Sequence, residues 1–266
     1  NSGEQTALAR AAAAQGFAVS VESGGAFCGE GSGAAAAAST AAILEPFLTA
    51  GGVVSHLLIE SVFSRTRAGC REQPVPATAA EVAQFAARLN QTFNGRAKFF
   101  LYDALPHYAV GAAYPANVPT YDLELGSVLQ AVTGHLAPTG VPLAGYWMDC
   151  PYEYSRDYPN ATTPLPTGSG FKKVAAAVEL VRSMGLAVGK TFNSQHGGAT
   201  SAKAFYTGTL ADVAAVSAAM PLDKLDYAMV ETWYPYPTNA APETMPYTTA
   251  YTALAAFRRF PSQGEA

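Results

Sequence analysis

The strongest constraint on the fold is a rhythm that repeats six times along the chain. An apolar, strand-like run is followed by a loop rich in glycine, proline or serine, and then by an alanine-rich helical segment. This alternation is typical of parallel β/α sheets. The six apolar runs predict strands at residues 17–23, 53–61, 97–103, 142–149, 186–193 and 225–231.

Two of the segments between these runs have clear helical periodicity. In 78–95 and in 171–184, apolar side chains recur every three or four positions, and the patterns stop at Gly95 and Gly185. A glycine at this place is a common helix terminator. We expect amphipathic helices that each cover one face of a sheet, and a further helix at 4–16, where the chain opens.

The length favours one barrel domain. The chain has 266 residues, and (β/α)8 barrels of about 250 residues form single domains. Units of roughly 40 residues would also suit a solenoid, but these units share a pattern and not a sequence. We therefore expect residues 1–266 to form a single (β/α)8-type barrel domain, incomplete or irregular because only six β/α units are evident.

Charge and hydropathy argue against nucleic acid and membrane partners. Charged residues make up 14% of the chain, the net charge is −4, and lysine and arginine are scattered. This distribution does not predict a basic surface for nucleic acid. The long alanine stretches are interrupted by Gly, Ser, Thr or Glu, so no run reaches the roughly 18 apolar residues of a membrane span.

Each predicted strand ends on a polar residue that a buried run does not need. In a barrel, the carboxyl ends of the strands and the loops after them form the active site, so these residues are expected to converge. Any one of them is explained equally well as a loop starter or helix cap. Five carboxylates among six ends are harder to explain in that way. The residues are Glu22, Glu60, Asp103, Asp149, Asn193 and Glu231.

Asp149 and Glu231 differ from the other strand ends because aromatic loops follow them. The loops read "CPYEYSRDYP" and "TWYPYPTNAAPETMPY". Aromatic faces pack against the C–H faces of sugar rings, while sugar hydroxyls bond to acids and amides. A carbohydrate substrate is therefore expected, although rings that only close the barrel rim remain an alternative, above all for Trp147. Further candidates for substrate contact are His107, Trp147, Tyr152, Glu153, His196, Trp233 and Tyr234, with Glu22, Glu60, Asp103 and Asn193.

A carboxylate pair across a groove is the machinery of glycoside hydrolysis. Glu231, among aromatic residues, is expected to be the proton donor, and Asp149 the nucleophile or base, although the reverse assignment stays open. Two strand spacings place the two backbones about 10 Å apart, which allows a retaining or an inverting reaction. Glu153 is the reserve candidate for the chemistry.

The segments "GYWMD" (145–149) and "AMVETWYP" (228–235) resemble those of TIM-barrel glycoside hydrolases, which carry catalytic acids at such strand ends. The likeness is one of layout and covers most of the chain. It implies a polysaccharide-degrading hydrolase with an acid/base pair and no cofactor. The sequence departs from this family in showing six strands where eight are expected and in opening on a helix, so parts of the barrel are missing from this chain or the barrel is irregular.

Two other function classes remain open. A metal-dependent hydrolase on the same barrel would use His107, His196, Asp149 and Glu231, because imidazole and carboxylate groups bind zinc. A barrel that binds carbohydrate without catalysis is the other alternative. The chain has no G-x-S-x-G element and no P-loop lysine, which argues against serine catalysis and a phosphate cradle.

The three cysteines bear on the compartment. Cys28 and Cys70 each follow a predicted strand by a short loop, so consecutive parallel strands would bring them together in a disulfide. Cys150 is expected to be a buried small residue. With few lysines and N-x-T sequons at Asn90 and Asn160, this predicts a secreted or periplasmic protein; three free thiols in a cytoplasmic enzyme are the alternative.

Overall fold

The computed structural model describes residues 2–70, 73–116, 123–157 and 167–261. The chain divides into two compact units. Unit 1 comprises Asn1–Asp103 and Ser127–Gly145, and unit 2 comprises Ala104–Gly126 and Tyr146–Ala266. The single domain expected over residues 1–266 stays a prediction.

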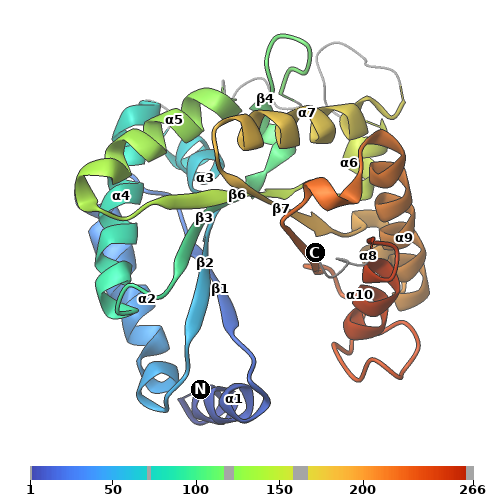
Figure 1. Ribbon diagram of the computed structural model, residues 1–266, viewed down its shortest axis with the longest axis horizontal. Helices are drawn as coiled ribbons and strands as arrows, with labels where there is room; N and C mark the ends of the chain where they lie inside the picture. Colours follow the sequence, from blue (N-terminus) through green and yellow to red (C-terminus); the bar gives the residue numbers. More distant parts are fainter. Residues whose placement is uncertain (1, 71–72, 117–122, 158–166, 262–266) are drawn as a thin grey trace. The chain divides into compact units, whose positions relative to one another are not determined.

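The helices and strands follow the expected alternation (Figure 1). The elements that lie wholly or mainly in unit 1 are α1 (Ser2–Gln15), β1 (Val19–Gly24), α2 (Ser32–Thr49), β2 (Val54–Glu60), α3 (Val62–Gly69), α4 (Val75–Thr92), β3 (Lys98–Ala104) and α5 (Leu125–Leu136). Strand β6 (Leu143–Asp149) begins in unit 1 and ends in unit 2. The remaining elements of unit 2 are β4 (Tyr108–Ala109), β5 (Leu123–Glu124), α6 (Tyr152–Asp157), α7 (Ser169–Ser183), β7 (Ala187–Phe192), α8 (Gln195–Thr200), α9 (Ala202–Ala219), β8 (Tyr227–Val230) and α10 (Thr249–Phe257).

All six predicted strands are present, and each boundary differs from the prediction by at most two residues. They belong to a six-stranded sheet in the order β1-β2-β3-β6-β7-β8. The pairs β1–β2, β2–β3 and β7–β8 are parallel. The protein therefore has the expected mixed α/β architecture with parallel strand pairs. The eight strands of a complete (β/α)8 barrel are not found in the described part of the chain.

The core of unit 1 lies on its two inner strands. Residues 57–59 of β2 and 99–101 of β3 are almost completely buried at three consecutive positions. Both faces of these strands are covered, which is why the runs are continuously apolar instead of alternating. Helices α2 and α4 lie side by side along the strands (Figure 1). They approach so closely that a Cβ on Gly33 would lie 2.0 Å from the carbonyl oxygen of Glu81.

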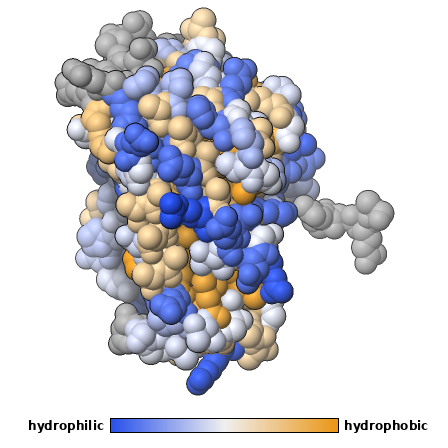
Figure 2. Space-filling model, turned by 90° about the vertical axis from the view of Figure 1, so that its left-hand side faces the viewer, coloured by the Kyte–Doolittle hydropathy of each residue, from blue (hydrophilic) through white to orange (hydrophobic). Residues whose placement is uncertain are grey.

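Several alanines of α2 are exposed to solvent on the side of the helix that faces away from the sheet. The buried residues of the helix recur every three or four positions, and exposed alanines occupy several positions between them. One face of the molecule is drawn in Figure 2, where hydrophobic and hydrophilic residues are mixed in small patches. No helix among the described residues is both long and apolar enough to cross a membrane.

Glycines end the predicted helices as expected. Gly95 follows the last turn of α4 with φ 70°, and Gly185 follows α7 with φ 74°. These left-handed conformations are accessible to glycine at little steric cost. Both predicted terminators are confirmed.

The structure differs from the predicted elements in three respects. Short helices α3, α6 and α8 occupy segments that were expected to be loops, and β4 pairs with β5 in a separate two-stranded sheet. Glu22 is not at a strand end, because β1 continues through Ser23 and Gly24. Its position within the paired part of β1 corrects that expectation.

Candidate active site

Three polar residues follow one another across the ends of neighbouring strands in unit 2. Asp149 is the last residue of β6, and Asn193 and Glu231 come directly after β7 and β8. Thr191 of β7 is level with Met229 of β8, so two residues further on Asn193 is level with Glu231. Since β7 lies between β6 and β8, the backbones at Asp149 and Glu231 are about 10 Å apart.

These three side chains share the face of the sheet that carries Trp147. The Trp147 indole N–H donates to Thr191 Oγ1 at 3.1 Å, and its ring stacks on Tyr227 with centroids 5.5 Å apart. A Cβ on Gly189 would lie 2.3 Å from the indole, so glycine makes room for the ring. Side chains two or four positions apart on a strand point to the same face. Asp149 and Asn193 follow Trp147 and Thr191 by two positions, and Glu231 follows Tyr227 by four, so all three lie on the face that carries the indole.

Trp147 lies on the same face of β6 as Asp149, two residues before it. Only 6% of its surface is exposed, and its indole N–H is already bonded within the sheet. These contacts favour the interpretation that Trp147 packs the core, and they leave little of its ring for a substrate.

Asn193 joins the strand ends to Asp149. It is 1% exposed, and its Nδ2 donates to Asp149 Oδ1 at 3.3 Å. A carboxylate only accepts hydrogen bonds, which fixes the orientation of the amide. The other amide atom, Oδ1, is buried and has no hydrogen-bond partner among the described residues. The donated bond favours the anionic form of Asp149.

The aromatic loop after β8 is anchored on α8. Thr232 Oγ1 accepts a hydrogen bond from the backbone N–H of Tyr234 and donates one to the carbonyl of Tyr236. The backbone N–H of Tyr236 donates to the carbonyl of Gly198 in α8. Trp233 and Tyr236 remain 46% and 37% exposed. The loop therefore has a defined conformation that presents aromatic rings to solvent.

Tyr234 links this loop to Asp149. Burial raises the pKa of Tyr234 to about 12, with further contributions from the negative charge of Asp149, from Tyr154 and from Glu153. The phenol therefore stays protonated at neutral pH and remains a hydrogen-bond donor near Asp149 and Glu153.

Glu153 holds the start of α8. Its carboxylate accepts bonds from Ser194 Oγ at 2.6 Å, from the N–H of Gln195 at 2.9 Å and from the N–H of His196 at 3.2 Å. A negative charge is favourable at the amino end of a helix. These contacts favour a structural role over the chemical role held in reserve for Glu153.

A cavity of about 480 Å³ lies beside α6, α8 and α9 in unit 2. Its lining includes Tyr152, Glu153, His196, Ser201 and Lys203, but neither Asp149 nor Glu231. Tyr152 and His196 line this cavity, whereas the two strand-end acids do not, and the substrate contacts expected at these residues stay predictions.

The acids predicted in unit 1 have local partners. Glu60 forms an ion pair with Arg65. Asp103 is 1% exposed and accepts bonds from Ser64 Oγ at 2.8 Å and the Ser64 N–H at 3.4 Å, which fixes the first turn of α3. Together with Glu22, these residues are carried by unit 1, so their convergence with Asp149 and Glu231 stays a prediction.

The residues proposed for a metal site do not form a ligand cluster. His107 lies in a short 3₁₀ segment (Leu105–His107), and His196 is exposed on α8. Within the described ranges, no group of three or more His, Cys, Asp or Glu side chains is arranged to hold a metal ion. The geometry gives the metal-dependent alternative no support.

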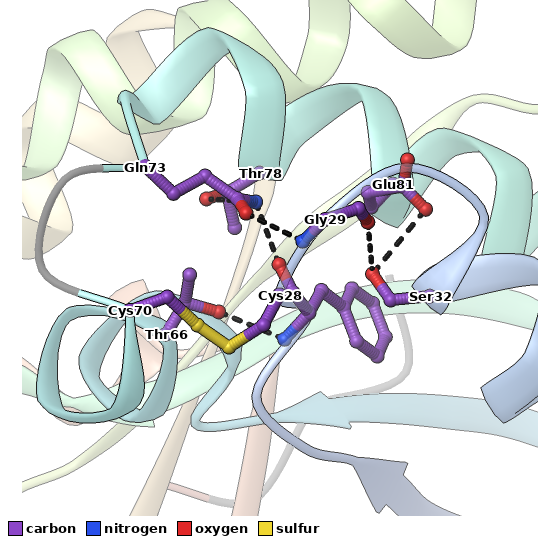
Figure 3. The surroundings of a disulfide bond; sticks show 9 residues. Cys28, Gly29, Ser32, Thr66, Cys70, Gln73, Thr78 and Glu81 are labelled. Atoms are coloured by element: carbon purple, nitrogen blue, oxygen red, sulfur yellow. Dashed lines mark hydrogen bonds between the residues drawn. A yellow bond between two sulfur atoms is a disulfide. The ribbon is translucent and has the colours of Figure 1, made fainter.

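The disulfide between Cys28 and Cys70 is present, as expected (Figure 3). Their Cα atoms are 5.9 Å apart, which is within the usual range. Gln73 reinforces the link by accepting a bond from the Gly29 N–H at 2.8 Å and donating to the Phe27 carbonyl at 2.6 Å. The bridge therefore ties the loop after β1 to the segment between α3 and α4.

Cys150 is the buried small residue that was expected. It is 3% exposed, and its Sγ lies 3.0 Å from Ser155 Oγ. Burial raises the pKa of its thiol to about 11, so the group stays protonated and is a poor nucleophile. Of the two sequons, Asn90 is half-buried on α4, while Asn160 lies outside the described residues.

Sequence reasoning missed a buried ion pair behind the site. Lys190 of β7 and Asp212 of α9 are both fully buried, and Lys190 Nζ lies 2.8 Å from Asp212 Oδ2. A lysine inside an apolar strand was the available signal, because a buried charge requires a partner. The partner is not evident from the sequence, since it lies on a helix further along the chain.

Comparison of the chain with models of known protein families and with curated proteins finds no match.

Proposed function

We propose that the protein is a glycoside hydrolase on a (β/α)8-type barrel and that Asp149 and Glu231 are its two catalytic carboxylates. One observation carries the proposal: the two acids end alternate strands on one face of the sheet, on either side of Asn193. A separation of about 10 Å between the backbones leaves room for side chains that meet a glycosidic bond from two sides.

The hydrogen bond from Asn193 supports one assignment of the roles. A donor to Asp149 favours its anion, which suits a nucleophile or base, and leaves Glu231 as the proton donor. Glu231 gives its proton to the glycosidic oxygen as the bond from that oxygen to the anomeric carbon breaks. In a retaining reaction Asp149 bonds to that carbon, and water then releases the sugar; in an inverting reaction Asp149 takes a proton from the attacking water.

The neighbouring groups suit a sugar substrate. The exposed rings of Trp233 and Tyr236 offer faces for stacking on sugar C–H groups. The sugar itself is identified by assaying the protein on a panel of polysaccharides.

Export to an oxidising compartment fits the same proposal. Structural disulfides persist in secreted and periplasmic proteins and are rare in the cytosol of most organisms. The Cys28–Cys70 bridge therefore supports a secreted or periplasmic hydrolase.

A polysaccharide panel tests the proposal. The wild-type protein, Asp149→Asn and Glu231→Gln are assayed for release of reducing sugar, with Glu179→Gln as control because that residue is an exposed acid on α7. We expect both site variants to lose roughly 1,000-fold or more in kcat with an unchanged circular dichroism spectrum. Hydrolysis of no panel member by the wild-type protein, or full activity of either site variant, would overturn the assignment.

A further inference from the structure

The Lys190–Asp212 pair is attached to the backbone on both sides of the candidate site. Lys190 Nζ donates to the carbonyl of Cys150 at 3.2 Å, directly after Asp149. The carboxylate of Asp212 lies near the backbone N–H of Asn193, which favours the ionised carboxylate, although its Oδ1 has no hydrogen-bond partner among the described residues. Lys190 therefore binds the backbone next to Asp149, and Asp212 lies near the backbone of Asn193, the two residues that share the side-chain hydrogen bond.

A third contact closes this arrangement. The backbone N–H of Tyr152 donates to the carbonyl of Asn193 at 3.1 Å, which links the loop after β6 to the end of β7. Lys190 also donates to the Thr191 carbonyl at 3.0 Å and lies 4.5 Å from the centre of the Phe192 ring. The ammonium group is thus fixed by several contacts at once.

Stability does not explain such a pair. Removing two charges from water costs much of what their attraction returns, and well-packed apolar residues of similar volume often replace a buried ion pair without loss of stability. Burial raises the pKa of Asp212 to about 6 even though Lys190 opposes the shift, in line with the cost of burying a carboxylate.

We propose that Lys190 and Asp212 are positioning residues, whose buried ion pair holds the ends of β6 and β7 so that Asn193 Nδ2 stays within hydrogen-bond reach of Asp149. Lys190 lies on β7 and Asp212 on α9, and both side chains are fully buried, so the pair acts through the backbone that it contacts. The catalytic consequence rests on the proposed function, whereas the effect on Asp149 does not.

The test replaces the pair without leaving an unpaired charge. Lys190→Met/Asp212→Leu removes the bond to the Cys150 carbonyl and the polar group near Asn193, whereas Lys190→Met/Asp212→Asn keeps a side-chain oxygen near the Asn193 N–H. Both changes remove the same two charges, so a difference in the Asp149 pKa between the two variants does not arise from the lost charges and reports geometry. Thr252→Val is the control, because Thr252 is buried in α10 and its hydroxyl donates to the carbonyl of Thr248, the N-cap residue of the same helix.

The first measurement is the pKa of the Asp149 carboxyl, followed by NMR with ¹³C-labelled aspartate and assigned with Asp149→Asn. We expect a rise of about one unit in Lys190→Met/Asp212→Leu, a smaller rise in Lys190→Met/Asp212→Asn and no change in Thr252→Val. The second measurement is activity on the substrate found in the panel. We expect kcat of the Met/Leu variant to fall roughly 10- to 100-fold, with KM changed less than kcat.

The outcomes separate this inference from the proposed function. If the wild-type protein hydrolyses no sugar but the Asp149 pKa still rises in the Met/Leu variant, the proposed function fails and the positioning role stands. An Asp149 pKa equal to that of the wild type in the folded Met/Leu variant would overturn the positioning role. Failure of both double variants to fold, while Thr252→Val folds, would also overturn it, since the pair would then be a requirement of the fold.

Discussion

Asn193 is the residue whose replacement tests the candidate site most directly. Its amide donates to Asp149 and so favours the anion. In Asn193→Ala this donor is lost, and we expect the pKa of Asp149 to rise by about one unit, which is about 1.4 kcal/mol of lost interaction with the charged form. The acid limb of the kcat/KM profile should move to higher pH by the same amount. An acid limb at the wild-type position would show that the hydrogen bond does not tune Asp149.

The thiol of Cys150 gives a second prediction at the scale of one residue. With its pKa raised to about 11 by burial, roughly one molecule in a thousand carries the thiolate at pH 8. We expect iodoacetamide to leave the native protein unmodified over the time in which a free thiol reacts. Denatured protein without reductant should contain one reactive thiol, and reduced protein three. Three thiols before reduction would contradict the Cys28–Cys70 bridge.

Residue identities at the strand ends could be predicted because strand parity and strand exits are local properties. The alternation of Trp147 and Asp149 is visible in the sequence, and the structure places them as that alternation requires. The contacts of Lys190 and Glu153 could not be predicted in the same way. Their partners come from elements distant in the chain, and only the packing of those elements brings them together.

Helix α8 depends on a side chain from another element. In Glu153→Gln the three donors at its start lose a charged acceptor. We expect the free energy of unfolding to fall by about 1–3 kcal/mol, with kcat reduced far less than in Asp149→Asn. Denaturant titration measures the first effect. Glu179→Gln should change stability by less than about 0.5 kcal/mol, because its pair with Lys224 is exposed. A kcat loss equal to that of Asp149→Asn would restore Glu153 as a chemical residue.

Strand β7 carries a glycine that the neighbouring indole requires. A Cβ at Gly189 would lie 2.3 Å from Trp147, so we expect Gly189→Ala to lower stability by about 1–3 kcal/mol and to shift tryptophan fluorescence. Gly134 is the matched control, because it lies in α5 and a Cβ there meets no atom within 4 Å. Gly134→Ala should raise stability by up to about 1 kcal/mol. Equal effects of the two substitutions would contradict the close packing of Trp147 on β7.

At the scale of elements, the sequence predicted what is long and periodic. The six strands are apolar runs, and the helices α4 and α7 have repeating apolar patterns that stop at glycines. The positions of these elements therefore follow from local chemistry. Helices α6 and α8 have 6 residues each and are too short for a periodic pattern. They exist because other elements bind them, as Glu153 binds the start of α8.

For the whole molecule, the alternation of strands and helices predicted the fold class but not the number of strands in the sheet. Parallel pairing and strand order follow from repeated strand–helix connections. Closure into eight strands depends on how many strands pair at the two outer edges, and no local pattern in β1 or β8 specifies that number. The division into two compact units is likewise a property of packing between distant segments.

The two units can be followed separately, because both tryptophans, Trp147 and Trp233, belong to unit 2 and the disulfide belongs to unit 1. Fluorescence therefore reports on unit 2, while far-ultraviolet circular dichroism reports on both units. The bridge closes a loop between residues 42 apart, and its loss is expected to cost unit 1 about 4 kcal/mol at most. With reductant, we expect the circular dichroism transition in urea to begin at a lower concentration than the fluorescence transition.

Variants distinguish this effect from a general action of the reductant. Cys28→Ser/Cys70→Ser without reductant should reproduce the early transition, and Cys150→Ala, which keeps the bridge, should not. The comparison uses the midpoints of the two signals, since coincident transitions are the mark of two-state unfolding. If both signals coincide in the reduced protein, the units unfold together, and the disulfide then stabilises the whole chain instead of unit 1 alone.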